Sequence, residues 1–217
     1  MFDLDGTLVD TVEVRIRAWM QVFAEIGIPA DREHVARLIG ADGKRLAKEV
    51  ANVANRHIDD DRAEAIDKRS GAIYDELNTD PRPIAGARAL LLALCRSALP
   101  WAIATSSRSE QVRASVDALK LPERPRIVDG SHVEHAKPAP DLLLLAAEQL
   151  RTPPSRCWYV GDATWDMLAA RAAGMIGIGV PYGVASKSDL LNAGARTVTM
   201  FRSLQAELNR RGLLAPT

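Results

Sequence analysis

The sequence has 217 residues, of which 47% are hydrophobic and 26% charged, and its 28 basic side chains equal its 28 acidic ones in number. This size and composition predict one domain with a modest insertion, and enough apolar material for a hydrophobic core. Balanced charge gives no electrostatic case for nucleic acid or for a membrane surface as a partner, although it leaves local basic patches open. We therefore expect neither nucleic acid nor a membrane as a partner.

Features of secreted and membrane proteins are also missing. The first residues lack a basic segment followed by an apolar stretch, which argues against a signal peptide. The longest apolar run, residues 89–95, is far shorter than the ~20 residues that cross a bilayer. Cys95 and Cys157 are expected to be buried free thiols of a reducing compartment. These features predict a soluble cytoplasmic protein, with monomer and homodimer not distinguished.

The first elements in chain order are a very short strand and a helical block. Only Met1 and Phe2 precede the acidic loop that begins at Asp3, so either the start of the chain is incompletely represented or this strand is a stub. Residues 12–80 contain no strand candidate and carry apolar side chains at helical spacing. Four helices are expected, one ending near Gly27 and three near residues 32–39, 43–55 and 60–77.

The rest of the chain alternates between apolar strands and helices. Strands are predicted at residues 101–105, 126–129, 158–161, 175–180 and 197–200, and helices at 109–119, 140–150, 164–173, 186–192 and 203–209. Apolar strands that alternate with helices indicate a parallel sheet covered on both faces. The fold class is therefore α/β: a doubly wound, Rossmann-like core of residues 1–11 and 82–217, with residues 12–81 inserted as an α-helical cap.

The loop after the first strand carries two aspartates. Asp3 and Asp5 alternate in a strand-like segment and should face the same side. Two such carboxylates repel one another unless a cation lies between them or one of them is protonated. This pair suits a division of labour, with Asp3 as an ionised nucleophile and Asp5 as the acid and then the base.

Two further loops at strand ends offer groups that bind phosphate. Thr105 and Ser106 follow an apolar strand and can present hydroxyl and backbone N–H donors, although a helix cap alone would also explain them. Lys137 precedes two prolines that stiffen its loop, so its ammonium group could offset the carboxylates and hold a phosphate.

A fourth loop supplies more carboxylates. Asp162 directly follows a strand, and together with Asp3 it offers the hard oxygen ligands that Mg²⁺ prefers. Asp166 lies four residues later and either binds the cation through water or stabilises the start of its helix. The sequence therefore predicts a Mg²⁺ site where four loops converge at the carboxyl ends of the strands.

In order and spacing, these segments resemble the four motifs of the haloacid dehalogenase superfamily. The matching residues are Asp-Leu-Asp-Gly-Thr at 3–7, Thr105, Lys137-Pro-Ala-Pro-Asp, and Gly161-Asp162 with Asp166. The helical insertion resembles the small cap of the branch that contains phosphoglycolate phosphatases and β-phosphoglucomutases. The resemblance extends over roughly residues 1–200.

The resemblance implies a mechanism and a site. Asp3 would attack phosphorus, and Asp5 would protonate the leaving alkoxide and then activate water. Thr105, Ser106 and Lys137 would bind the phosphoryl group. Mg²⁺ would be held by Asp3, the backbone carbonyl of Asp5, Asp162 and, in or near that shell, Asp166. The segments 6–11 and 80–83 would be the hinges of the cap.

The same resemblance favours a phosphatase that acts on a small phosphorylated metabolite. Dehalogenases lack the second acid, which is Asp5 here, and the related mutases carry a histidine where this chain has Arg15. Arg15, Lys44 and Arg45 are candidates for contacting an anionic or hydroxyl-rich leaving group, the alternative being solvated helix charges. A phosphosugar mutase, a phosphonatase and a non-catalytic Mg²⁺-binding regulatory module remain open.

Overall fold

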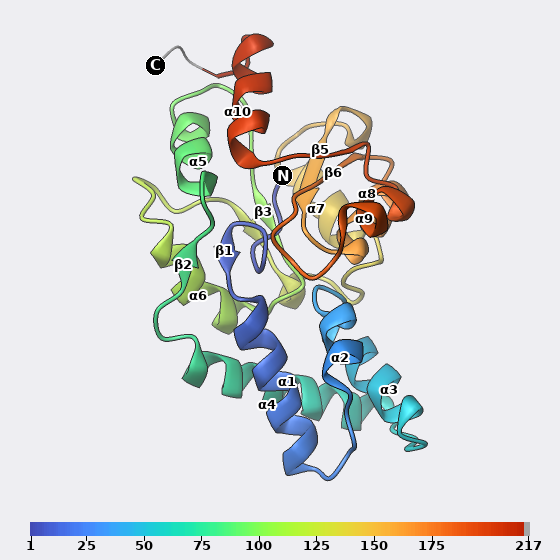
Figure 1. Ribbon diagram of the computed structural model, residues 1–217. Coiled ribbons are helices and arrows are strands. Elements are labelled where there is room, and N and C mark those ends of the chain that lie inside the picture. Colours follow the sequence, from blue (N-terminus) through green and yellow to red (C-terminus); the bar gives the residue numbers. More distant parts are fainter. Residues whose placement is uncertain (215–217) are drawn as a thin grey trace.

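A parallel β-sheet forms the centre of the protein in the computed structural model, which describes residues 1–214 (Figure 1). Its strands are β3 (Ile103–Ala104), β4 (Ile127–Val128), β5 (Trp158–Gly161), β6 (Ile176–Gly179) and β7 (Thr197–Val198). β4 pairs with β3, and β5, β6 and β7 pair in that order. All of these pairs are parallel, so the α/β fold class predicted from the sequence is confirmed.

The two parts of the sheet are joined by a single residue, Phe2. It forms parallel bridges to Ile103 on one side and to Val160 on the other. Its carbonyl accepts a hydrogen bond from the Ala104 amide at 2.8 Å, and the Asp3 amide donates to the Val160 carbonyl at 2.9 Å. This pairing places Asp3 at the carboxyl end of the sheet's centre.

Helices cover both faces of the sheet because successive side chains of each strand point to opposite sides. Phe2, Ile103 and Val160 pack with α5 (Ala87–Cys95), α6 (Ser109–Ala118) and α10 (Phe201–Arg210). Met1 and Tyr159 alternate with them and pack with α7 (Asp141–Gln149) and α8 (Thr164–Ala172). The remaining helix, α9 (Lys187–Ala193), packs on α8, and short 3-10 helices span Gly130–His132 and Pro154–Arg156.

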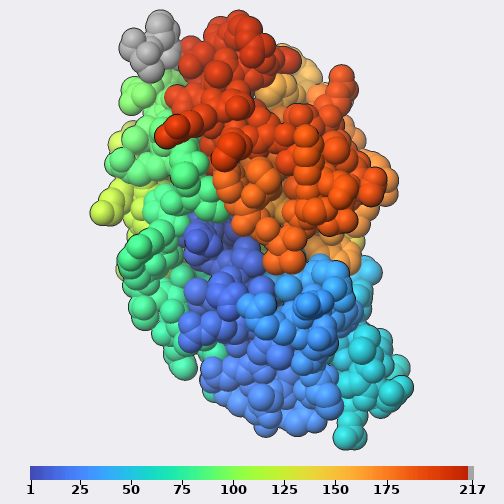
Figure 2. All heavy atoms as spheres, in the orientation of Figure 1, coloured from blue at the N-terminus to red at the C-terminus, as the bar shows by residue number. Residues whose placement is uncertain are grey.

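The four helices predicted within residues 12–80 gather beside the carboxyl ends of the strands (Figure 1), and their blue to teal atoms lie at one end of the molecule in Figure 2. They are α1 (Val12–Glu25), α2 (Arg32–Leu38), α3 (Gly43–Val53) and α4 (Asp60–Leu77). They share one hydrophobic cluster that is distinct from the two clusters flanking the sheet. We propose that residues 12–81 form the cap and residues 1–11 and 82–217 the core, of which 215–217 lie outside the described residues.

The two segments that connect cap and core run side by side. β1 (Val9–Asp10) pairs antiparallel with β2 (Arg82–Pro83), and the Ile84 amide donates to the Leu8 carbonyl at 2.9 Å. This ladder was not predicted, because each strand has only two residues and one of them is a proline. It ties the two proposed hinge segments together at the base of the cap.

One prediction about the cysteines is wrong. Cys157 is buried, but Cys95 is exposed, and both are free. Cys95 is the last residue of α5, whose buried face includes Leu90, Leu91 and Leu94. The adjacent residues Leu90 and Leu91 are both buried, so helix periodicity alone does not separate Cys95 from the core; the packing around the end of the helix leaves its thiol uncovered. Among the described helices, none has the length and apolar character needed to cross a membrane.

Candidate active site

Asp3 and Lys137 form the centre of the site. Lys137 Nζ lies 2.6 Å from Asp3 Oδ1 and 2.7 Å from Asp166 Oδ1, and 3.3 Å from the hydroxyl of Tyr159. The lysine side chain is 1% exposed, so its charge is balanced by these carboxylates rather than by water. Burial would lower the pKa of Lys137, but Asp166 and Asp3 raise it well above its ordinary value. The lysine is therefore a fixed positive charge beside Asp3.

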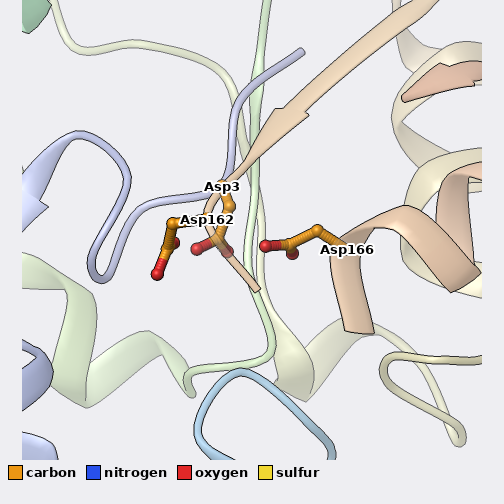
Figure 3. A group of neighbouring side chains, drawn as sticks. All are labelled: Asp3, Asp162 and Asp166. Atoms are coloured by element: carbon orange, nitrogen blue, oxygen red, sulfur yellow. The ribbon is translucent and has the colours of Figure 1, made fainter. Parts of the chain in front are cut away.

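Three buried carboxylates meet beside this lysine. Asp3, Asp162 and Asp166 each offer an oxygen within 4.8 Å of the others, and Figure 3 shows Asp166 pointing toward the other two. Burial, together with Asp166 and against the opposing charge of Lys137, raises the pKa of Asp3 to about 7. Burial, Asp166 and Asp3 likewise raise the pKa of Asp162. One ammonium does not balance three carboxylates, so this donor set fits a divalent cation with a preference for oxygen ligands.

Asp166 serves its helix as well as this cluster. Its Oδ2 accepts a hydrogen bond from the Ala163 amide at 2.9 Å, while its Oδ1 faces Lys137. The two roles that the sequence left open are therefore compatible. The opposite side of the cluster is fixed by Thr7, whose hydroxyl donates to Asp162 Oδ1 at 2.6 Å.

Asp5 belongs to a different hydrogen-bond network. Its Oδ2 accepts from Arg15 Nη2 at 2.9 Å and from the Ser107 hydroxyl at 2.5 Å. Its Oδ1 accepts from the hydroxyls of Thr11 at 2.7 Å and Tyr74 at 3.0 Å. Burial disfavours the charged form, but Arg15 and the hydroxyl donors outweigh it and hold the pKa of Asp5 below its ordinary value. In this arrangement Asp5 is a carboxylate with both oxygens engaged.

The two networks line one cavity between core and cap. Asp3, Asp5, Thr105, Ser106 and Lys137 all contribute to its wall, and its volume is about 50 Å³. This is room for only a few water molecules. The Ser106 hydroxyl also donates to the backbone carbonyl of Gly40 in the cap at 3.2 Å, so the loop after β3 touches the cap directly.

The three cap residues proposed from the sequence lie in two places. Arg15 lines the cavity and contacts Asp5, as described above. Lys44 and Arg45 line a separate surface cleft together with Glu49 and His135. Arg45 Nε donates to Glu49 at 2.7 Å, and its guanidinium lies 5.1 Å from the ring centre of Trp165.

Several residues around the site were not anticipated. Ser107 directly follows the predicted Ser106, so its place in the sequence could have suggested it. Tyr159 lies in β5, the strand that leads to Asp162, and on the same face of the sheet as Met1, so its place in the sequence could have suggested it too. Tyr74 and Gln111 gave no signal, because they reach the site through the packing of α4 against α6. Gly183 is the least expected, since a Cβ there would lie 1.8 Å from Asp162 Oδ2.

Replacing Gly183 with alanine is expected to displace the Asp162 carboxylate. Thr7 holds the other oxygen, so the side chain cannot move without losing that bond. We expect about tenfold weaker divalent-cation affinity, the lower end of the loss typical for residues that orient metal ligands. Titration calorimetry with Mn²⁺ measures this, with Val184→Ala on the exposed neighbour as control. Equal affinities of the two variants would contradict the role of Gly183.

The comparison with known families settles the family of the chain. A family described as haloacid dehalogenase-like hydrolase matches residues 1–180. The chain is a haloacid dehalogenase-like hydrolase. The resemblance found in the four motifs is thereby confirmed, and with it the predicted enzyme class of phosphoric monoester hydrolases, to which the relatives named below belong.

Individual relatives of this hydrolase cover most of its length. The fructose-1-phosphate phosphatase YqaB of Escherichia coli (strain K12) is 29% identical over 83% of this chain and 94% of its own. A phosphoglycolate phosphatase of Pseudomonas fluorescens is 31% identical over 84% of this chain and 69% of its own. The crystal structure of a hydrolase from Pseudomonas syringae is 34% identical, covers 96% of both chains and superposes with a TM-score of 0.90.

Proposed function

We propose that this hydrolase releases phosphate from a small phosphorylated metabolite in a Mg²⁺-dependent reaction that passes through a phosphorylated Asp3. The observation that carries the proposal is the buried group of Asp3 and Lys137, 2.6 Å apart, beside the carboxylates of Asp162 and Asp166. A nucleophile, a fixed positive charge and a set of oxygen ligands are what phosphoryl transfer to a carboxylate requires. The phosphatase names of the relatives support the same reaction.

In the first half of the reaction, an Asp3 oxygen attacks phosphorus and the bond to the leaving oxygen breaks. Lys137 orients Asp3 and offsets negative charge. Thr105 and Ser106 line the cavity wall, and we propose that they donate to the phosphoryl oxygens, Ser106 through its backbone amide because its hydroxyl is bound to Gly40. A protonated Asp5 would give its proton to the leaving alkoxide. Since Arg15 keeps Asp5 ionised in the closed arrangement, this step requires the pair to separate, and we propose that movement of α1 with the cap achieves it.

In the second half, a water molecule attacks the phosphorylated Asp3 and loses its proton to Asp5. The arrangement seen here suits that step, because the lowered pKa of Asp5 keeps it as the carboxylate that accepts a proton. The cavity of about 50 Å³ excludes all but a few waters while it happens. Asp5 is thus proposed to alternate between acid and base as the cap opens and closes.

Mg²⁺ fits the donor set described above. Asp3, Asp162, Asp166 and the backbone carbonyl of Asp5 are the proposed ligands, with Asp3 also the nucleophile. When bound, the cation neutralises charge on the phosphoryl group and on the crowded carboxylates. The identity of the cation, the phosphorylated Asp3 and a cytoplasmic location stay predictions of this proposal.

Removal of divalent cations tests the proposal directly. Phosphate release from a panel of sugar, polyol and acid phosphates is expected to fall on the order of 1,000-fold in EDTA, because a metal ion supplies several kcal/mol to such transition states. Excess Mg²⁺ should restore it, and Na⁺ should not. Undiminished release in EDTA would contradict the metal's role. An isomerised phosphate ester in place of free phosphate would identify a mutase.

A further inference from the structure

The cap contributes a distinct wall to the cavity, formed by Arg15, Trp19, Gly43, Leu46 and Asp67. In the proposed reaction the phosphoryl group occupies the core side, next to Asp3 and Lys137. The leaving group therefore faces this cap wall and the core residues beside it, Ser107 and Gln111. The charges of these residues decide which leaving groups can be accommodated.

The positive charge of the cap wall is that of Arg15, which already has hydrogen-bond partners in the protein. Arg15 donates through Nη2 to Asp5 and Ser107, and through Nη1 to Gln111 Oε1 at 2.9 Å. Its guanidinium carbon lies 3.4 Å from the ring centre of Tyr74, so one face is covered as well. An anion entering from the leaving-group side would have to compete with Asp5 for this one cation.

The second guanidinium group near the wall, that of Arg108, is also paired with carboxylates. Arg108 Nη2 contacts both carboxylate oxygens of Glu64 at 2.9 Å and Asp67 Oδ2 at 2.9 Å. Two guanidinium groups thus face three carboxylates, those of Asp5, Glu64 and Asp67. Neither Arg108 nor Glu64 lines the cavity itself. The charged residues that do are Asp3, Asp5 and Asp67 against Arg15 and Lys137, so the lining carries a net negative charge.

Asp67 provides a hydrogen-bond acceptor in this wall. Both of its hydrogen bonds in residues 1–214 are made through Oδ2, to Arg108 Nε at 3.0 Å and Nη2 at 2.9 Å. Its side chain is 16% exposed and lines the cavity. Oδ1 lies 1.9 Å from where a Cβ of Gly43 would be, so the carboxylate occupies space that only glycine leaves open. A hydroxyl group is the natural partner for an acceptor in this position.

We infer that the substrate is a phosphorylated polyol or sugar whose leaving group is uncharged, and that Asp67 is the specificity-determining residue that accepts one of its hydroxyls and repels a carboxylate or second phosphate. This inference rests on the proposed phosphatase activity and narrows it. It separates two substrates that the relatives' names leave open, a sugar phosphate and phosphoglycolate. The apolar side chains of Trp19 and Leu46 in the same wall suit the carbon skeleton of such a leaving group.

The experiment compares two substrates that differ in one group. Glycerol 3-phosphate and 3-phosphoglycerate have the same length, and a carboxylate in the second replaces a hydroxymethyl group in the first. We expect the catalytic efficiency, kcat/KM, to favour glycerol 3-phosphate by about tenfold or more, the effect of one close like-charge contact at a partly exposed site. p-Nitrophenyl phosphate serves as a reference substrate that lacks both groups.

The matched variants are Asp67→Asn and Glu64→Gln. Both remove one carboxylate from Arg108, but only Asp67 lines the cavity. In Asp67→Asn the preference for glycerol 3-phosphate should fall about tenfold, because the enzyme then hydrolyses 3-phosphoglycerate more efficiently. In Glu64→Gln the wild-type preference should persist.

The outcomes separate this inference from the function on which it rests. A wild-type preference for 3-phosphoglycerate, or equal preferences in the two variants, would overturn the inference while p-nitrophenyl phosphate is still hydrolysed. Failure to release phosphate from any of the three substrates, with Mg²⁺ present, would overturn the proposed function and the inference together. The wild-type comparison stands on its own if Asp67→Asn does not fold.

Discussion

Replacing Asp3 with asparagine is expected to reduce phosphate release on the order of 10⁴-fold or more, the scale of loss when a covalent nucleophile is removed. The amide keeps the shape of the side chain but cannot form the acyl phosphate. Lys137 retains Asp166 as a partner at 2.7 Å, so the site should stay folded. The measurement is a continuous phosphate assay in Mg²⁺, with a phosphorylated-enzyme signal sought by intact-protein mass spectrometry in the wild type alone.

A suitable control for this variant is Asp10→Asn, which changes an exposed aspartate of β1 in the same segment. It should keep wild-type activity.

Stability offers a second readout of the Asp3 variant, since the pKa of Asp3 is raised to about 7 in the folded protein. Without metal, the folded state then binds a proton that the unfolded chain releases above about pH 4, so wild-type stability falls as pH rises toward 7. Asp3→Asn should show a smaller fall. An active Asp3→Asn enzyme would overturn the proposed mechanism.

Replacing Lys137 with methionine is expected to have the largest effect on folding. The lysine is 1% exposed and is the cation bound to both Asp3 and Asp166. Its removal leaves these buried carboxylates without their cationic partner, a change that costs about 3–5 kcal/mol. Chemical denaturation in EDTA should show this loss as a lower midpoint with an unchanged slope.

Two further measurements sharpen the lysine prediction. Lys44→Met, in the surface cleft, should leave the midpoint nearly unchanged. Mg²⁺ should recover part of the stability of Lys137→Met, since it supplies positive charge to the same carboxylates, but not its activity. If Lys137→Met were as stable as Lys44→Met in EDTA, the buried ammonium would not be the charge that holds this cluster together.

The site residues that lie in loops directly after strands were predictable from the sequence. Asp3, Thr105, Lys137 and Asp162 each come directly after, or in the loop after, an apolar segment, and parallel strands bring such loops to one edge. Residue type and order along the chain were therefore enough to predict that these side chains meet. The helices of the cap were predictable for a related reason, since apolar residues at helical spacing mark their buried faces.

The partners of Asp5 were not predictable in this way. Alternation predicted Asp5 on the same side as Asp3, and both line the cavity, but a turn after Asp5 makes this residue bridge to Val9 rather than continue the sheet. Its contacts with Arg15 and Tyr74 depend on how the cap helices lie against the core, which no local pattern records. The two-residue strands β1 and β2, the exposure of Cys95 and the role of Gly183 escaped for the same reason, because each is decided by tertiary packing.

The pairing of Phe2 with Ile103 and Val160 also has a consequence for biosynthesis. Phe2 is synthesised long before β5, so its pairing with Ile103 can form first, and its pairing with Val160 must wait until more than half of the protein is made. Contacts this far apart along the chain form slowly and late. Nascent chains that stop short of β5 can fold the helices of the cap but cannot close the sheet, so apolar strand edges stay exposed until β5 is made.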